Sequence, residues 1–225
     1  MGPAVAVVDL HCHTSASFDS LAAAEHVLQA AVARGLTHLA ITDHDTIDGA
    51  LRARDAAPAG LRVLVGQEVR TRQGDLICVF LETPIPAGLP VLEAIQAARD
   101  QGALVGMPHP YDRARASLLA TGDLAAAEVQ ALAAGVDWVE ACNARILREG
   151  DNRRAAAFAR THNVPGVSVS DAHSVMEVGL VSTTLLGDPS TPAGLLAALR
   201  TPVAGHAPDP GAGYARTLLA RLARR

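Results

Sequence analysis

The chain has 225 residues, enough for one sizeable α/β domain, and 49% of them are hydrophobic but only 3% aromatic, so its core must consist mainly of Ala, Val, Leu and Ile. The formal charge of −4 argues against general nucleic-acid binding through a basic surface. The chain contains no lysine, which excludes a Schiff-base mechanism and leaves arginine, backbone N–H groups or metal ions to bind a phosphate.

The cysteines and the amino terminus indicate the compartment. Cys12, Cys78 and Cys142 fall in or beside expected strands and form no CxxC pair, which is typical of reduced, buried thiols in a cytosolic protein. The amino terminus lacks the pattern of a signal peptide, and no apolar stretch approaches the ~20 residues of a membrane helix. We therefore expect a cytoplasmic protein without a membrane partner, and the sequence leaves its oligomeric state open.

Short apolar runs alternate with alanine-rich helical patterns along the chain. Strands are expected at residues 5–10, 38–42, 61–65, 76–81, 104–107, 137–141, 167–169 and 180–185. Helices are expected at residues 21–34, 51–57, 92–101, 124–134, 152–161 and 193–200, followed by a basic helix that ends at Arg225. The fourth strand can pair directly with the third. This alternation predicts a largely parallel sheet in a single domain over residues 1–225, with a short helical tail from about residue 205.

Histidine, carboxylate or amide side chains follow the carboxyl ends of six strands, the edge where active sites lie in α/β barrels and open α/β sheets. His11 and His13 are two residues apart on a strand, so both imidazoles face the same side and can hold one metal ion. The other candidates are Asp19 in the loop after the first strand and His44, Glu68, His109, Asn143, Asp171 and His173 after later strands.

Each of these signals is weak by itself. A lone HxH pair is as often a hydrogen-bonded surface pair, and Asp19 in a Phe-Asp-Ser stretch is commonly a turn or helix-cap residue. Five histidines and three acidic residues at or near strand ends are, however, an improbable accident, so we favour a metal site. The remaining histidines have no such placement and are expected to be ordinary surface or hydrogen-bonded side chains: His26, His38, His162 and His206.

Five motifs in order carry a resemblance to a known family: Asp-Leu-His-Cys-His-Thr, Thr-Asp-His-Asp, Gly-Gln-Glu, Pro-His-Pro and Ser-Asp-Ala-His. The series resembles that of the PHP (polymerase and histidinol phosphatase) family, from about residue 8 to residue 180. Pro-His-Pro-Tyr-Asp-Arg and Glu-Ala-Cys-Asn-Ala-Arg are further similar to small bacterial stand-alone members. The resemblance implies an α/β fold, a distorted (β/α)7 TIM-like barrel, with two or three divalent ions, usually Mn²⁺, Zn²⁺ or Fe²⁺.

The resemblance also implies how the ligands are shared. One ion would take His11, His13, Glu68 and Asp171; Glu68 would bridge to a second ion, also bound by His109; a third would take Asp19, His44 and His173. Many members have a histidine as the last ligand of the second ion where this chain has Asn143. A neutral amide is a weaker ligand than imidazole, so the second ion is expected to bind loosely or to arrive with substrate. Cys142 precedes this position and is expected to face the other side of the strand.

The expected activity is metal-dependent hydrolysis of a small phosphomonoester or a nucleotide-type phosphodiester, through attack by a hydroxide that bridges two ions beside Glu68. Arg113 and Arg145 follow strand-end motifs and are candidates to neutralise phosphoryl oxygens. Asp45 is a candidate to protonate the leaving group, and Asp43 to orient His44 or another ligand. Two alternatives stay open: a hydrolase of a C–N or carboxyl ester bond, and a non-catalytic metal-binding module. Pocket loops choose the substrate, so its identity is not readable from the sequence.

Overall fold

The computed structural model describes residues 4–201, and each expected strand and helix in this range is present. The strands are β1 (Val5–Asp9), β2 (His38–Ile41), β3 (Arg62–Arg70), β4 (Asp75–Val79), β5 (Leu104–Met107), β6 (Trp138–Asn143), β7 (Gly166–Val169) and β8 (Thr183–Leu186). The helices are α1 (Ala24–Ala33), α2 (Asp48–Asp55), α3 (Val91–Asp100), α4 (Ala126–Gly135), α5 (Glu149–Thr161) and α6 (Pro192–Leu199). His206 and the expected carboxyl-terminal helix lie outside the described residues.

The strands form one sheet in the order β7-β6-β5-β4-β3-β2-β1-β8. Pairing is parallel between β1, β2 and β3 and between β5, β6 and β7, whereas β4 is antiparallel to both neighbours and β8 is antiparallel to β1. This confirms that the fourth strand pairs directly with the third. The hydroxyl of Thr183 accepts the backbone N–H of Ser168 at 2.8 Å and donates to its carbonyl at 2.9 Å, which brings the two ends of the sheet together. The expected distorted barrel is therefore confirmed, with eight strands that nearly close.

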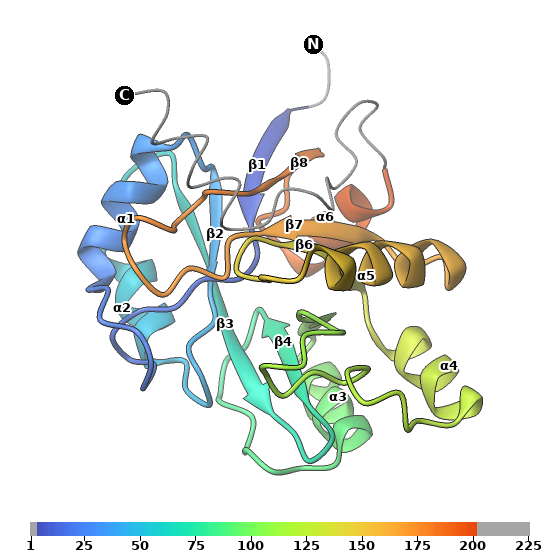
Figure 1. Ribbon diagram of the computed structural model, residues 1–225. Helices are drawn as coiled ribbons and strands as arrows, with labels where there is room; N and C mark the ends of the chain where they lie inside the picture. The colour runs from blue at the N-terminus through green and yellow to red at the C-terminus, as the bar shows by residue number, and fades with distance from the viewer. Residues whose placement is uncertain (1–3, 202–225) are drawn as a thin grey trace.

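Two apolar clusters hold the barrel together. Helices surround the strands, with α1 and α2 on one flank and α3 and α4 on another (Figure 1), and a cluster built mainly of Ala, Val, Leu and Ile fills the space between helices and sheet. A smaller cluster contains Leu64, Trp138 and Val169. Side chains alternate along a strand. Residues two or four positions after those of the second cluster on the same strand therefore lie on the same face of the sheet, closer to the carboxyl end of the strand.

One glycine fixes how tightly this inner cluster packs. Gly106 of β5 lies opposite Trp138 of β6, and a Cβ atom added to it would stand 2.1 Å from the indole ring. Trp138 is fully buried, so the absence of a side chain at Gly106 is what makes room for the indole.

Cys12, Cys78 and Cys142 are buried and unbridged, as expected. Among residues 4–201, no helix combines the length and apolar character needed to cross a bilayer.

Candidate metal centre

His11, His13 and Glu68 meet beyond the carboxyl end of β1 and within the last part of β3. The Nε2 atom of His11 lies 2.9 Å from that of His13 and 3.1 Å from Glu68 Oε2, and His13 Nε2 lies 3.2 Å from the same oxygen. Asp171 Oδ1 stands 3.6 and 3.7 Å from the two imidazole nitrogens. Four buried ligand-type side chains thus converge on one point; they are the residues that the family resemblance implies for the first ion.

A second group lies at the edge of this cluster and consists of His13, Asp19, His44 and His173, whose ligand atoms all lie within 4.8 Å of one another. Asp19 Oδ2 is 3.0 Å from His173 Nε2 and 3.4 Å from His44 Nε2. These are the residues predicted for the third ion, joined by His13. Asp19 therefore does more than terminate a turn, because it points at two imidazoles from distant segments.

The third group consists of Glu68, His109 and Asp75, again with ligand atoms within 4.8 Å of one another. His109 Nε2 lies 3.0 Å from Glu68 Oε1, the oxygen that does not face His11 and His13. Glu68 therefore presents one oxygen to each side, which is the geometry that a bridging carboxylate needs. Asp75 was not predicted; in the sequence it looks like an ordinary acidic residue of a Gln-Gly-Asp turn between two strands.

Three imidazoles of the centre have their Nδ1 atoms hydrogen-bonded away from it. His11 Nδ1 donates to Glu140 Oε1 at 2.7 Å, while His13 and His109 pair through Nδ1 with the hydroxyls of Ser17 and Ser117 at 2.9 and 3.0 Å. Each of these residues then turns Nε2 toward Glu68. The contact with Glu140 keeps a proton on Nδ1 of His11, so Nε2 is the nitrogen that would bind a metal ion.

Glu140 was not predicted from the sequence either. Besides His11, it accepts the backbone N–H of His109 at 2.9 Å and the Nδ2–H of Asn143 at 2.8 Å, both through Oε2. An acidic residue in the middle of a buried, otherwise apolar strand was the signal that could have found it. A fully buried carboxylate needs such donors, so Glu140 and the ligands that it contacts depend on one another.

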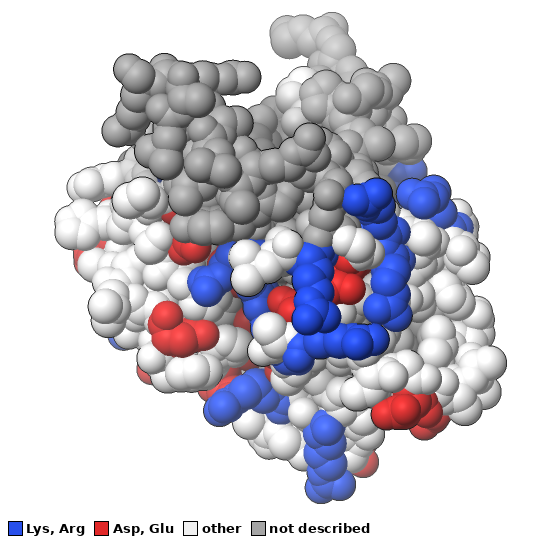
Figure 2. Space-filling view, viewed as in Figure 1, with Lys and Arg blue, Asp and Glu red and all other residues white. Residues whose placement is uncertain are grey.

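Arginines line the small cavity that contains these groups. The cavity has a volume of about 260 Å³ and is bordered by Arg70, Arg115 and Arg145 together with Glu68, His109 and Asp171. On the face shown in Figure 2, arginine side chains gather around a place where acidic side chains are visible. Arg115 forms an ion pair with Asp171 and was missed, because the loop that carries it has no periodic pattern.

The two predicted arginines are placed differently. Arg145 borders the cavity of the ligand groups, whereas Arg113 borders two neighbouring cavities and is absent from the lining of this one.

The two predicted aspartates beside His44 are occupied by other partners. Asp45 has a left-handed backbone (φ 55°) and forms an ion pair with Arg70, whose backbone N–H it also accepts at 3.0 Å. Asp43 accepts the backbone N–H and the hydroxyl of Thr14, at 2.6 and 2.7 Å, rather than contacting the imidazole of His44. The Nδ1 atom of His44 is buried without a hydrogen-bond partner among the described residues.

The charges of the cluster shift its pKa values in opposite directions. Burial opposes a charge on His11, but Asp171, Glu140 and Glu68 outweigh it and hold the pKa of this imidazole well above its usual range. Burial likewise opposes ionisation of Glu68, but His11 and His109 hold the pKa of this carboxyl well below its ordinary value. Burial, followed by the charge of Glu68, raises the pKa of Asp75 to about 7. His11 and His109 thus favour ionised Glu68, whereas at Asp75 their effect on the pKa is outweighed by burial and by the charge of Glu68.

Similarity to known proteins agrees with this geometry. Residues 9–133, more than half of the chain, match the model of the PHP domain. The chain belongs to the PHP family. Residues 149–202 match a second model, described as PHP-associated, so most of this PHP chain is covered by the two matches.

Curated relatives of this PHP chain include two uncharacterized proteins of Methanocaldococcus jannaschii. MJ1587 is 36% identical over 114 residues, which are 46% of this chain and 67% of the relative, and MJ0417 is 32% identical over 172 residues, 76% and 67% of the two chains. A 5'-3' exoribonuclease of Haemophilus influenzae is 32% identical over 129 residues, 52% of this chain and 46% of the relative.

Solved structures share the fold of this PHP chain. A two-domain protein of Bacteroides vulgatus, described as containing a predicted PHP-like metal-dependent phosphoesterase, superposes with a TM-score of 0.72 at 19% identity, covering 88% of this chain and 63% of the other. PsfC of Pseudomonas syringae superposes with a TM-score of 0.68 at 19% identity over 98% and 99% of the two chains. An amidohydrolase of Chromobacterium violaceum gives 0.56 at 17% identity over 82% and 93%.

Asn143 occupies the position where the family resemblance implies a histidine in many members. Its Oδ1 atom accepts the backbone N–H of Arg145 at 2.9 Å, and its Nδ2 atom donates to Glu140 Oε2 and Asp171 Oδ2, each at 2.8 Å. The amide thus orients two carboxylates of the centre. A histidine here could not make the same three contacts.

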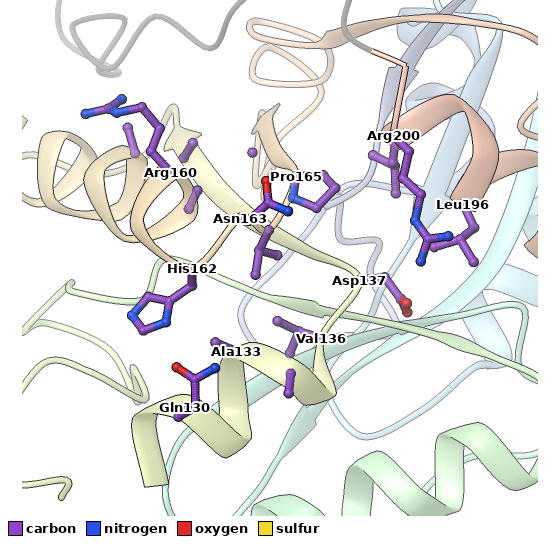
Figure 3. A pocket seen from close by; sticks show the side chains of 17 residues that line it. Gln130, Ala133, Val136, Asp137, Arg160, His162, Asn163, Pro165, Leu196 and Arg200 are labelled. Atoms are coloured by element: carbon purple, nitrogen blue, oxygen red, sulfur yellow. The ribbon is translucent and has the colours of Figure 1, made fainter. Parts of the chain in front are cut away.

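The ligand groups fit divalent ions on the chemistry of their donors. Mixed imidazole and carboxylate sets suit zinc, manganese and iron, and the buried carboxylates around Glu68 need cationic charge beyond what Arg115 supplies. Another cavity, of about 970 Å³, lies between α4, the end of α5, the start of β7 and the end of α6 (Figure 3). None of the three ligand groups borders this cavity.

Proposed function

We propose that this chain is a metal-dependent phosphoesterase that hydrolyses a small phosphomonoester or a nucleotide-type phosphodiester. One observation carries the proposal: three groups of metal ligands lie at a cavity that arginines also border. A phosphoryl group requires both, since it is anionic before and during its transfer. The description of the Bacteroides vulgatus protein as containing a predicted phosphoesterase is consistent with the proposal.

Two or three divalent ions, Mn²⁺, Zn²⁺ or Fe²⁺, would supply Lewis acidity and lower the pKa of water. The side chains of the chain would do the rest. His11, His13, Glu68 and Asp171 would hold the first ion. Glu68 and His109 would hold the second ion, and Asp19, His44 and His173 would hold the third. Glu140, Ser17 and Ser117 would keep three imidazoles in the ligating orientation.

Substrate binding is assigned to the arginines. Arg145 borders the cavity, and its Nη1 atom is buried without a hydrogen-bond partner among residues 4–201, so it would contact phosphoryl oxygens. Arg115 would do so from its position beside Asp171. Asp45 would have to leave Arg70 before it could protonate a leaving group. The cavity of about 260 Å³ favours a small substrate group over a polymer held along a groove.

The test is a phosphoester screen on the full chain loaded with Mn²⁺. We expect release of phosphate or of a phenolate or nucleoside product from at least one monoester or diester, competitive inhibition by phosphate and vanadate, and loss of turnover in His11→Ala. Inactivity across a broad phosphoester panel, with ions shown to be bound by elemental analysis, would contradict the proposal.

The same screen separates the alternatives. A hydrolase of C–N or carboxyl ester bonds, an activity class consistent with the fold shared with the Chromobacterium violaceum amidohydrolase, would be little affected by vanadate. A non-catalytic metal-binding module would bind ions and turn over none of the substrates. A cytoplasmic location belongs to the proposal as well, and expression of a tagged chain followed by fractionation would test it.

A further inference from the structure

Asp75 occupies a position that the surrounding backbone fixes closely. It opens β4 opposite Arg70 of β3, is 5% exposed, and donates its backbone N–H to the carbonyl of Ala116 at 2.7 Å. Gly74 precedes it with φ +153°, and a Cβ atom there would stand 2.8 Å from the backbone nitrogen of Leu118. The hairpin and the loop at residues 116–118 therefore touch backbone to backbone, and this contact holds Asp75 beside the centre.

The carboxylate of Asp75 has an oxygen that nothing in residues 4–201 satisfies. Its Oδ1 atom is buried and has no hydrogen-bond partner, although a buried charged oxygen is costly without a donor or a cation. The side chain borders the metal-centre cavity, and its ligand atom lies within 4.8 Å of those of Glu68 and His109. The unsatisfied oxygen thus belongs to a side chain that faces two other ligands.

Strand β6 offers no equivalent ligand in the described part of the chain. Asn143, at the end of this strand, donates through Nδ2 to Glu140 and Asp171 and accepts the backbone N–H of Arg145 through Oδ1. For an ion beside Glu68 and His109, the unpaired oxygen of Asp75 on β4 would therefore be available as a ligand, whereas the amide of Asn143 on β6 is already hydrogen-bonded.

We infer that Asp75 is the third protein ligand of the second ion, together with Glu68 and His109. The inference rests on the proposed function in that it requires metal at the centre. Two carboxylates and one imidazole form a harder ligand set than one carboxylate and two imidazoles, and such oxygen-rich sets suit Mn²⁺. The second ion is then a built part of the centre, held by β3, β4 and the residue after β5, and it does not depend on substrate for its third ligand.

The test compares Asp75→Asn with Asp151→Asn. Asp151 is a matched control because it is also a buried aspartate with one unsatisfied oxygen, yet it belongs to none of the ligand groups. Full-length wild type and variants are stripped with chelator, equilibrated with Mn²⁺, desalted and analysed for ions per chain, with circular dichroism as a check of folding.

We expect folded Asp75→Asn to hold one ion fewer per chain than wild type, and Asp151→Asn to match wild type. Equal metal content in Asp75→Asn and wild type, or an equal loss in both variants, would overturn the assignment; so would loss of the ion on Asn143→Ala but not on Asp75→Asn. Phosphoester hydrolysis is assayed separately. A wild type that carries the Asp75-dependent ion but hydrolyses no phosphoester would refute the proposed function and leave the ligand assignment intact.

Discussion

Glu140 accepts the Nδ1–H of His11 over 2.7 Å, at a depth where neither side chain reaches solvent. The carboxylate comes from β6 and the imidazole lies just after β1, so the contact joins segments near the two ends of the sheet order. It also determines which nitrogen of His11 remains free to bind metal.

Glu140→Gln should weaken metal binding by about 10–100-fold, the usual effect of losing a carboxylate behind a metal-binding histidine. Glutamine replaces one of the two oxygens of Glu140 with an N–H₂ group. That group would face either the Nδ1–H of His11 or the N–H groups of His109 and Asn143, and it cannot accept a hydrogen bond from them. Competition with a fluorescent chelator measures the affinity for Mn²⁺. Asp137→Asn, which removes a carboxylate paired with Arg99 just before the same strand, should leave the affinity unchanged; equal loss in both variants would count against a role in positioning.

Added Mn²⁺ should raise the melting temperature of the wild type, because ions that bind only the folded chain stabilise it by about 2.7 kcal/mol at a concentration of 100 Kd. Chelator should reverse the shift. In His11→Ala the ion-dependent shift should be much smaller, since this residue contacts Glu68 and faces Asp171. Thermal denaturation followed by circular dichroism makes the measurement, and an unchanged shift in the variant would exclude His11 from the ligands.

Arg145→Ala should raise KM for a phosphoester by about 10-fold or more, since hydrogen bonds to charged groups contribute about 1.5–3 kcal/mol. Arg113→Ala is the matched variant, because both arginines follow strand-end motifs but only Arg145 borders the cavity of the ligand groups. Steady-state kinetics with the best substrate of the screen decides between them. A larger effect at Arg113 would place the phosphate outside this cavity.

Stability should fall above pH 9 in part because of Cys78. Burial raises the pKa of this thiol from 9.0 to about 12, so the folded chain keeps the proton that the unfolded chain releases in that interval. The free energy of unfolding should therefore drop by up to about 1.4 kcal/mol per pH unit from this group alone. Urea denaturation between pH 8.5 and pH 10.5 should show a shallower decline in Cys78→Ala. The decline should not vanish, because burial also raises the pKa of Cys12 well above its usual value.

Gly106→Ala should lower the free energy of unfolding by about 1–3 kcal/mol, the usual cost of an overpacked core. The new methyl group would overlap the indole of Trp138, which is fully buried. Gly150→Ala is the control: nothing lies within 4 Å of its added Cβ atom in α5, and alanine is the better helix former. Chemical denaturation should therefore show a lower free energy of unfolding in Gly106→Ala, and a slightly higher or almost unchanged one in Gly150→Ala.

Local pattern predicted the strands, the helices and eight ligand candidates, whereas the closure into a barrel was implied only by the resemblance to the PHP family. Apolar runs mark strands, and residues such as His11, His109 and Asp171 lie just beyond them, where parallel strands bring distant segments to one edge. The position of Asp19 beside His173 depends on the path of a loop, so local pattern could suggest it but could not establish it.

What the sequence left open depends on contacts between segments that carry no pattern. Asp75 looks like a turn residue until the hairpin is seen to lie against the loop at residues 116–118. Arg115 and Arg113 are two positions apart in that irregular loop, and nothing in their spacing tells which one reaches Asp171. Asn143 was considered as a weak ligand, whereas its hydrogen bonds make it a support for Glu140 and Asp171.

The closure of the barrel has a kinetic consequence. The backbone N–H of His13 donates to the carbonyl of Ala172 at 2.8 Å, so the ligand set unites the first and last parallel strands of the sheet. Such a set cannot assemble until nearly the whole chain has folded, and bringing its ends together carries the entropy cost of a long loop. An ion bound between these strands would therefore stabilise the completed barrel, and its main effect on folding should be to slow the opening of the closed barrel rather than to speed its formation.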